Sequence, residues 1–158
     1  MKETNFWGDR LKPGLEKRCK ELEFRHFFNR VENRVHEGDP DVDYCIAGVS
    51  GKIELKYQHR HPLRGGQVLG KGNGMRRSQI IFAARWCNAG GLLWLMVGTQ
   101  LKTWCIDLRK LDPWGMEAIE KMTPDELDAA AAWHAGPSVD DGLPYILVAC
   151  RRSAPHLS

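Results

Sequence analysis

The feature that most constrains the fold is a run of six apolar residues, Leu92 to Val97, directly after the glycine pair Gly90-Gly91. Such a run is typical of a β-strand that is covered by helices on both faces. A helical pattern over 76–88 precedes the run and ends at the same glycines, which favour a helix terminus. The sequence therefore predicts an α/β protein whose sheet lies between two layers of helices.

Other segments add helices and strands to this sheet. Residues 15–22 follow a helical pattern, and Thr123 begins an N-capped helix that runs to about His134. Over 24–35 the apolar spacing fits either a helix or a strand, and we expect a helix that ends near Phe28, followed by a strand. Further strands are predicted over 42–47, 52–57, 101–108 and 145–150, with a hairpin turn over 48–51.

The length and composition suit a single domain. The chain has 158 residues, of which 42% are apolar, and this is enough for one hydrophobic core. No stretch is as long as a membrane span, the first residues lack the apolar stretch of a secretion signal, and the five cysteines form no CxxC pair. We therefore expect a cytoplasmic protein with free thiols and no membrane association.

Positive charge is concentrated in one segment. The chain has a net charge of +3, whereas residues 52–77 contain seven Lys or Arg and one acid, a local balance of +6. Within this segment, residues 58–75 contain five glycines and are expected to form a mobile loop. Such a block suits a polyanion such as nucleic acid, and equally a solvated loop that carries charge for solubility.

Residues 65–71 fit GxxxxGK, but Gly72 replaces the Ser or Thr of a P-loop, so we expect no nucleotide cofactor.

Two carboxylates and a lysine lie on the predicted hairpin. Asp41 starts the first strand and Glu54 lies on the return strand, with twelve residues between them. Since alternate residues of a strand share a face, Glu54 and Lys56 point the same way, and the hairpin can bring Asp41 beside them. Adjacent carboxylates repel unless a divalent cation lies between them, and their oxygens suit Mg²⁺ or Mn²⁺. The backbone carbonyl of Leu55 is a further candidate ligand, and Lys56 is placed to orient a water molecule.

The same residues resemble the motif of the PD-(D/E)xK nuclease superfamily. The resemblance is carried by Gly38-Asp39-Pro40-Asp41 and Glu54-Leu55-Lys56. It extends to Gln79, because related enzymes often place a glutamine at the start of the next helix, and it covers roughly residues 15–98. The stretch 30–42 is similar to small phage and prophage members of this class, close to VRR-Nuc domains and Holliday-junction resolvases.

This resemblance implies a fold, an activity and a further acid. The fold would be a restriction-endonuclease-like core with a central mixed β-sheet flanked by helices. One nuclease domain over 1–158 would contain a motif-bearing core over about 15–108 and a C-terminal extension over about 109–158. The activity would be Mg²⁺-dependent hydrolysis of DNA phosphodiester bonds, directed at branched DNA or Holliday junctions. An acid from the N-terminal helix usually completes such a site, and Glu32, Glu16 or neither takes that place here.

The same resemblance suggests roles for other polar residues, and two other functions remain as alternatives. Gln79 would bind a phosphate or the attacking water, or it is only a polar residue at a helix start. The functional alternatives are a general DNA nickase or host-DNA-degrading nuclease, and a non-catalytic nucleic-acid-binding module on the same fold. Basic residues expected to hold the DNA backbone are Arg60, Arg64, Lys71, Arg76 and Arg77.

A homodimer is expected if the protein resolves junctions, because paired cuts need two sites and one chain holds one motif set. The chain offers apolar material for such an interface near its N-terminus. The alternative is that these residues pack under the sheet of a monomer. They are Phe6, Trp7, Leu11, Leu15, Phe24, Phe27 and Phe28.

Overall fold

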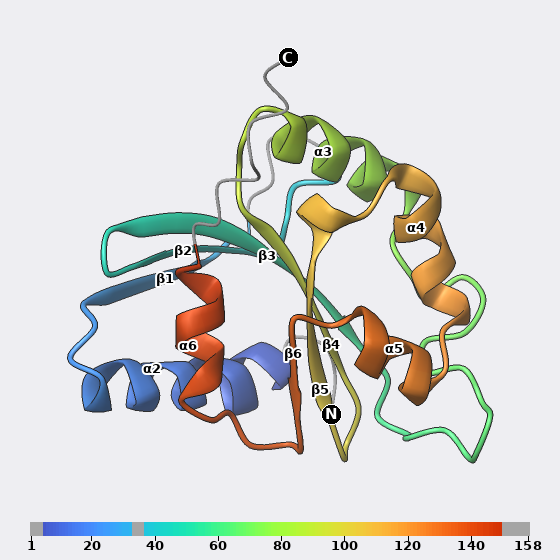
Figure 1. Ribbon diagram of the computed structural model, residues 1–158, viewed down its shortest axis with the longest axis horizontal. Coiled ribbons are helices and arrows are strands. Elements are labelled where there is room, and N and C mark those ends of the chain that lie inside the picture. The colour runs from blue at the N-terminus through green and yellow to red at the C-terminus, as the bar shows by residue number, and fades with distance from the viewer. Residues whose placement is uncertain (1–4, 33–36, 150–158) are drawn as a thin grey trace.

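A six-stranded sheet forms the centre of the computed structural model, which describes residues 5–32 and 37–149 (Figure 1). The strands lie in the sheet in the order in which they occur in the chain. They are β1 (His26–Arg30), β2 (Val42–Ile46), β3 (Val49–Tyr57), β4 (Leu93–Gly98), β5 (Thr103–Asp107) and β6 (Trp133–Ala135).

Strand direction follows from the connections between the strands. β3 and β4 run parallel. The connection between them contains α3 (Arg77–Asn88), which returns the chain to the end of the sheet at which β3 began. The other four neighbouring pairs are antiparallel, and the tight turn between β2 and β3 makes a hairpin. The protein is therefore α/β with a mixed sheet flanked by helices, as the sequence predicts.

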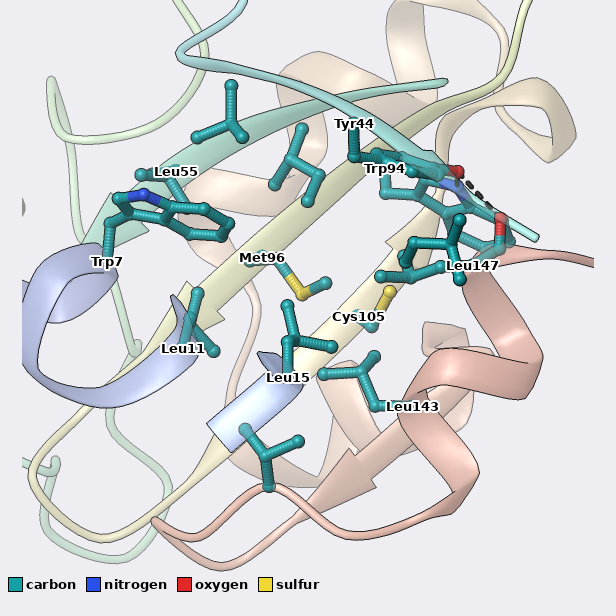
Figure 2. Packing of buried hydrophobic residues seen from close by; sticks show 14 of the residues in the cluster. Trp7, Leu11, Leu15, Tyr44, Leu55, Trp94, Met96, Cys105, Leu143 and Leu147 are labelled. Atoms are coloured by element: carbon teal, nitrogen blue, oxygen red, sulfur yellow. Dashed lines mark hydrogen bonds between the residues drawn. The ribbon is translucent and has the colours of Figure 1, made fainter. Parts of the chain in front are cut away.

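One face of the sheet is covered by η1 (Phe6–Leu11), α2 (Lys12–Glu21) and α6 (Gly142–Leu147), as Figure 1 shows. Figure 2 shows the core on this side, where helix side chains meet Trp94 and Met96 from β4. Two polar atoms inside it satisfy one another, since Trp94 Nε1 donates to Tyr44 Oη at 2.8 Å. The Tyr44 hydroxyl in turn donates to the carbonyl of Leu147 at 2.7 Å, which ties α6 to the sheet.

The opposite face is covered by α3 together with elements from the C-terminal third. These are η2 (Leu108–Lys110), α4 (Pro113–Ala118), η3 (Ile119–Lys121) and α5 (Pro124–Ala130). We call the core in Figure 2 the first core and the core on this opposite face the second core. Glu54 and Lys56 point to this opposite face, because they pair in register with Leu95 and Val97, which belong to the second core. Ile53 and its neighbours on the other face belong to the first core, so the predicted alternation along β3 is confirmed.

Four predicted elements are wrong. The hairpin turn predicted over 48–51 lies earlier, at Ala47-Gly48, because Val49 already pairs with Ile46 as the first residue of β3. No helix ends near Phe28, because α2 stops at Glu21 and the following residues form the edge strand β1, which pairs with β2. The helix predicted to run to His134 stops at Ala130, and the chain then adds β6 to the sheet. The segment predicted as a final strand forms α6 as far as Leu147, and residue 150 lies outside the described residues.

The apolar N-terminal residues are part of the core rather than an exposed patch. Phe6, Trp7, Leu11 and Leu15 are buried, and Phe24 and Phe28 are partly buried against the same cluster. Of the residues expected at a dimer interface, Phe27 is exposed, at 65%. The expectation of a large exposed aromatic surface is therefore wrong, because η1 and α2 turn these side chains onto the sheet. Among the described residues, no helix is long and apolar enough to cross a membrane, and the cysteines there are free.

Candidate active site

The β2–β3 hairpin places two carboxylates side by side. Val42 pairs with Ile53, so Asp41 lies opposite Glu54 at the point where β2 begins. Asp41 Oδ2 accepts a hydrogen bond from the backbone N–H of Leu55 at 2.8 Å, and this fixes the carboxylate against β3. Asp41 and Glu54 are 1% and 2% exposed. Two buried carboxylates thus lie on adjacent strands at matching positions, an arrangement that like charges disfavour.

Gly38 explains why the segment before Asp41 can lie so close to α3. Its φ of +89° is in the left-handed region, which glycine adopts without steric cost. A Cβ atom at this position would also overlap the carbonyl oxygen of Ser78, in the first turn of α3. Glycine is therefore required here, and it lets the helix start next to the hairpin.

Lys56 and Gln79 surround the carboxylate of Glu54. Lys56 Nζ lies 3.9 Å from Glu54 Oε1, and Gln79 Nε2 donates a hydrogen bond to the same oxygen at 2.7 Å. The other end of the Gln79 amide accepts from the backbone N–H of Arg76 at 2.8 Å, which caps α3. Because Gln79 is 3% exposed and uses both ends of its amide, it couples the start of α3 to the position of Glu54.

These side chains open into one cavity of about 310 Å³, which we call the hairpin pocket. Glycine-rich backbone from the loop over 58–75 forms one side of this pocket. The lining residues are Asp41, Glu54, Lys56, Tyr57, Gln58, Gly72, Asn73, Gly74, Arg76 and Gln79.

The glycine-rich side of the pocket is anchored by η3 from the C-terminal third. The N–H of Gly70 donates to the carbonyl of Glu120 at 2.9 Å, and the N–H of Gly72 donates to its carboxylate at 3.2 Å. Val68 and Leu69 are buried in the second core. The sequence predicts a mobile loop over 58–75, and this is wrong for its second half, which is packed and hydrogen-bonded.

The donor set of the hairpin pocket suits a small hard cation. Mg²⁺ commonly binds through one or two carboxylates and completes its shell with waters and substrate phosphates. Asp41 and Glu54 supply two carboxylates, whereas Leu55, whose carbonyl is the third candidate oxygen from the sequence, is not among the lining residues. Within residues 5–32 and 37–149, no three His, Cys, Asp or Glu side chains come together as a metal-binding group.

Neither acid expected to complete the site lies in the hairpin pocket. Glu32 is exposed beyond the end of β1 and is not among the lining residues. Glu16 lies on α2, where its Oε2 is 4.0 Å from His26 Nε2. His26 pairs with Ile46, at the end of β1 opposite to Asp41. Neither side chain therefore lines the pocket in this structure, and whether Glu32, Glu16 or neither completes a functional site stays a prediction.

The five basic residues expected to hold DNA differ in position. Arg60, Arg64 and Lys71 are exposed on the loop, and Lys71 directly precedes the lining residue Gly72. Arg76 lines the hairpin pocket, whereas Arg77 lines a neighbouring cavity between α3 and α4.

Sequence reasoning missed Arg30 as a neighbour of Asp41. Arg30 Nη2 lies 3.9 Å from Asp41 Oδ1, and its Nη1 is buried without a hydrogen-bond partner. The contact arises because β1 pairs with β2, so that Arg30 lies opposite Val42. Reading 24–28 as a helix concealed this register.

Comparison with known proteins identifies no family for this sequence. The sequence matches no protein-family model and no curated protein.

Proposed function

We propose that the protein is a metal-dependent endonuclease that hydrolyses phosphodiester bonds of DNA, on a PD-(D/E)xK-like core. The observation that carries the proposal is the buried pair Asp41 and Glu54, with Lys56 Nζ 3.9 Å from Glu54, in one pocket. Placing like charges together costs stability, so such a pair is more typical of a functional site than of a structural one. The mixed sheet flanked by helices is compatible with this fold.

The charged and amide side chains of the pocket each have a role in this proposal. Asp41, Glu54 and the carbonyl of Leu55 would hold Mg²⁺ or Mn²⁺. When bound, such an ion polarises the phosphoryl group and makes a water molecule more acidic. Lys56 orients the attacking water and offsets negative charge that develops on the phosphoryl oxygens. Gln79 keeps Glu54 in place through its hydrogen bond, and Arg76 offers a guanidinium to a substrate phosphate at the pocket wall.

The substrate proposal includes branched DNA, and it rests on the resemblance of the motif residues. Paired cuts in a junction need two hairpin pockets, so a homodimer belongs to the same proposal. Arg60, Arg64 and Lys71 are exposed on the loop and supply positive charge for the phosphate backbone, and Lys71 directly precedes the lining residue Gly72.

Cleavage assays with labelled DNA test this proposal directly. The wild-type protein and Glu54→Gln are incubated with a four-way junction, a duplex and a single strand, in Mg²⁺, Mn²⁺ or EDTA. We expect cleavage of at least one DNA by the wild-type protein in Mg²⁺ or Mn²⁺, none in EDTA, and none by the variant. Cleavage that persists in EDTA or in Glu54→Gln would show that the pocket is not the active site.

A non-catalytic nucleic-acid-binding module is the second candidate. It is favoured by the cations and donors that the chain itself places around the carboxylates, namely Arg30 near Asp41 and Lys56 with Gln79 near Glu54. Calorimetric titration with Mn²⁺ separates the two candidates. Binding by the wild-type protein that is lost in Asp41→Asn supports the nuclease, whereas DNA binding without any Mn²⁺ binding supports the module.

A further inference from the structure

A second cavity lies next to the hairpin pocket and is lined by residues of α3 and α4. These two helices are neighbours on one side of the sheet (Figure 1). Its volume is about 430 Å³, and we call it the α3–α4 slot. Apolar side chains make up half of its lining, which also includes the indole of Trp114, a side chain that is 79% exposed. The apolar lining residues are Met75, which is buried, Ile80, Ile81 and Pro113.

The packing of α4 does not account for Trp114. The helix is fixed by Asp112, whose carboxylate accepts from the N–H of Gly115 at 2.7 Å, and by Met116, which is buried in the second core. Trp114 adds little to this core, because most of its surface faces solvent. A large exposed aromatic side chain that lines a partly apolar cavity is typical of a binding site.

The slot and the hairpin pocket share a wall. Gly74 and Arg76 line the hairpin pocket, whereas Met75 and Arg77 line the slot. This alternation is expected of an extended backbone, and Arg76 has φ −72° and ψ 159°. Glu120 also joins the two cavities, because it lines the slot while its carboxylate accepts from Gly72 of the hairpin pocket. A polymer bound in one cavity therefore passes directly beside the other.

The chemistry of the slot favours a nucleobase over a phosphate. Bases stack on indole rings whatever their sequence, and the apolar side chains that line the slot offer a second surface for the base. Glu117 and Glu120 repel phosphates, whereas their carboxylates can accept hydrogen bonds from the amino groups of bases. Arg77 supplies one cation in the lining of the same slot for the adjoining phosphate.

We propose that the α3–α4 slot binds an unpaired base of the nucleic-acid strand that lies across the hairpin pocket, stacked on Trp114. The inference rests on the proposed function, because that function supplies the strand. It specifies the substrate further, as a nucleic acid with at least one unstacked nucleotide beside the phosphodiester that is cut. A paired base is held in its helix and is not available to this slot.

Binding in EDTA, where no cleavage is expected, tests the inference without relying on activity. Fluorescence anisotropy compares a labelled single-stranded DNA, the blunt duplex of the same sequence and a single-stranded RNA. We expect Trp114→Ala to weaken single-strand binding about 5- to 100-fold, which corresponds to roughly 1–3 kcal/mol per stacked base. Trp114→Phe retains an aromatic ring and restores most of the loss, and duplex binding stays unchanged. Tyr145→Ala is the matched control, since this aromatic residue is 54% exposed on α6, across the sheet.

A double-mutant cycle then locates the base. One abasic nucleotide is moved stepwise along the single strand. At one position it weakens binding to the wild-type protein but causes no further loss in Trp114→Ala, because the stacking partner is already absent.

Equal binding of the single strand by the wild-type protein and Trp114→Ala overturns the inference and leaves the proposed nuclease intact. Conversely, base-dependent binding at Trp114 without any cleavage of nucleic acid overturns the nuclease and leaves the slot. Absence of nucleic-acid binding overturns both. If Trp114→Ala instead converts a dimer to a monomer in light scattering, with no change in base dependence, the slot is a contact between two copies and the inference is wrong.

Discussion

Asp41 and Asp107 are both buried aspartates at strand ends, yet their surroundings differ in kind. They are 1% and 5% exposed. Asp107 ends β5 and accepts from Arg109, two residues away, through Nε at 3.0 Å and Nη2 at 2.8 Å. This hydrogen bonding raises the pKa of Arg109. Asp41 depends on residues distant in sequence, since its hydrogen bond comes from Leu55 on the next strand.

The difference indicates what each carboxylate is for. Asp107 is neutralised by a neighbour in the chain and caps η2, so its pairing stabilises a local turn. Asp41 lies opposite a second buried carboxylate, Glu54, and its ion pair with Arg30 is long, at 3.9 Å. A protein that only needed a stable fold would gain from separating Asp41 and Glu54. We therefore expect Asp107 to affect stability and Asp41 to affect activity.

The largest expected effect is the loss of activity in Asp41→Asn and Glu54→Gln. Each amide keeps an acceptor for the existing hydrogen bond, from Leu55 or from Gln79, and removes only the charge. The rate of DNA cleavage should fall about 1,000-fold or more, because several kcal/mol of transition-state stabilisation is lost with a metal ligand. The melting temperature should stay the same or rise, because repulsion is relieved. Steady-state cleavage and calorimetry of the same samples measure both, and normal cleavage by either variant would refute the site.

Asp107→Ala should give the converse result. Removing one partner of a buried ion pair leaves Arg109 without its bidentate acceptor and should cost about 3 kcal/mol. In a chain of this size the melting temperature should fall by about 6–12 °C. Cleavage per folded molecule should not change. Asp107→Ala combined with Arg109→Met should recover part of the stability, and a loss of catalysis without a loss of stability would remove the distinction between the two aspartates.

Gly38 and Gly48 sharpen the comparison, because both have positive φ and only one has a close neighbour. Gly38 has φ +89° and lies against Ser78, whereas Gly48 has φ +81° and open space around its Cα. Gly48→Ala should cost about 1 kcal/mol through backbone strain alone. Gly38→Ala should cost about 2 kcal/mol and lower the cleavage rate about 10- to 100-fold, since it shifts Asp41 relative to Glu54. Equal cleavage by the two variants would show that Gly38 does not position Asp41.

The hairpin and its carboxylate pair could be predicted from the sequence because their determinants are local. The alternation along β3 indicates that Glu54 and Lys56 share a face, and the turn signal indicates a hairpin. The exact register differs from the prediction, because the chain turns at Ala47-Gly48 rather than over 48–51, and the observed register brings Asp41 opposite Glu54. The same holds for α3, whose end is marked by glycines. Residue types at short spacing were sufficient in these places.

The parts that could not be predicted depend on partners far away in the chain. The spacing of Phe24 to Arg30 suits a helix, but pairing with β2 makes β1 a strand, and only this pairing brings Arg30 to Asp41. The apolar run at Tyr145 fits a strand equally well, yet Leu143 and Leu147 share a helical face that packs in the first core. Anchoring of the glycine-rich loop by Glu120 is equally non-local.

The smallest expected effect concerns Asp128, a third aspartate that is partly exposed. Partial burial raises the pKa of its carboxyl, but hydrogen bonds from Lys102 Nζ at 2.6 Å and Trp104 Nε1 at 2.7 Å outweigh this and lower it. A lowered pKa favours the carboxylate in the folded state. Its contribution to stability is therefore complete at neutral pH and is lost as the pH falls through the folded-state pKa. Since exposed pairs contribute only about 0.2–1 kcal/mol, Asp128→Asn should destabilise the protein by no more than this amount at neutral pH.

As the pH falls through the folded-state pKa of Asp128, which lies below its ordinary value, the destabilisation caused by Asp128→Asn should disappear, because the wild-type carboxyl then also becomes uncharged. Urea unfolding of both proteins at each pH measures the difference. Asp107→Asn under the same conditions should retain a larger effect at neutral pH, since that carboxylate is buried with its arginine. If the difference in stability between the wild-type protein and Asp128→Asn did not change with pH, the charge of the Asp128 carboxylate would not contribute to stability. The effects of the three aspartates on stability would then differ because of burial rather than charge.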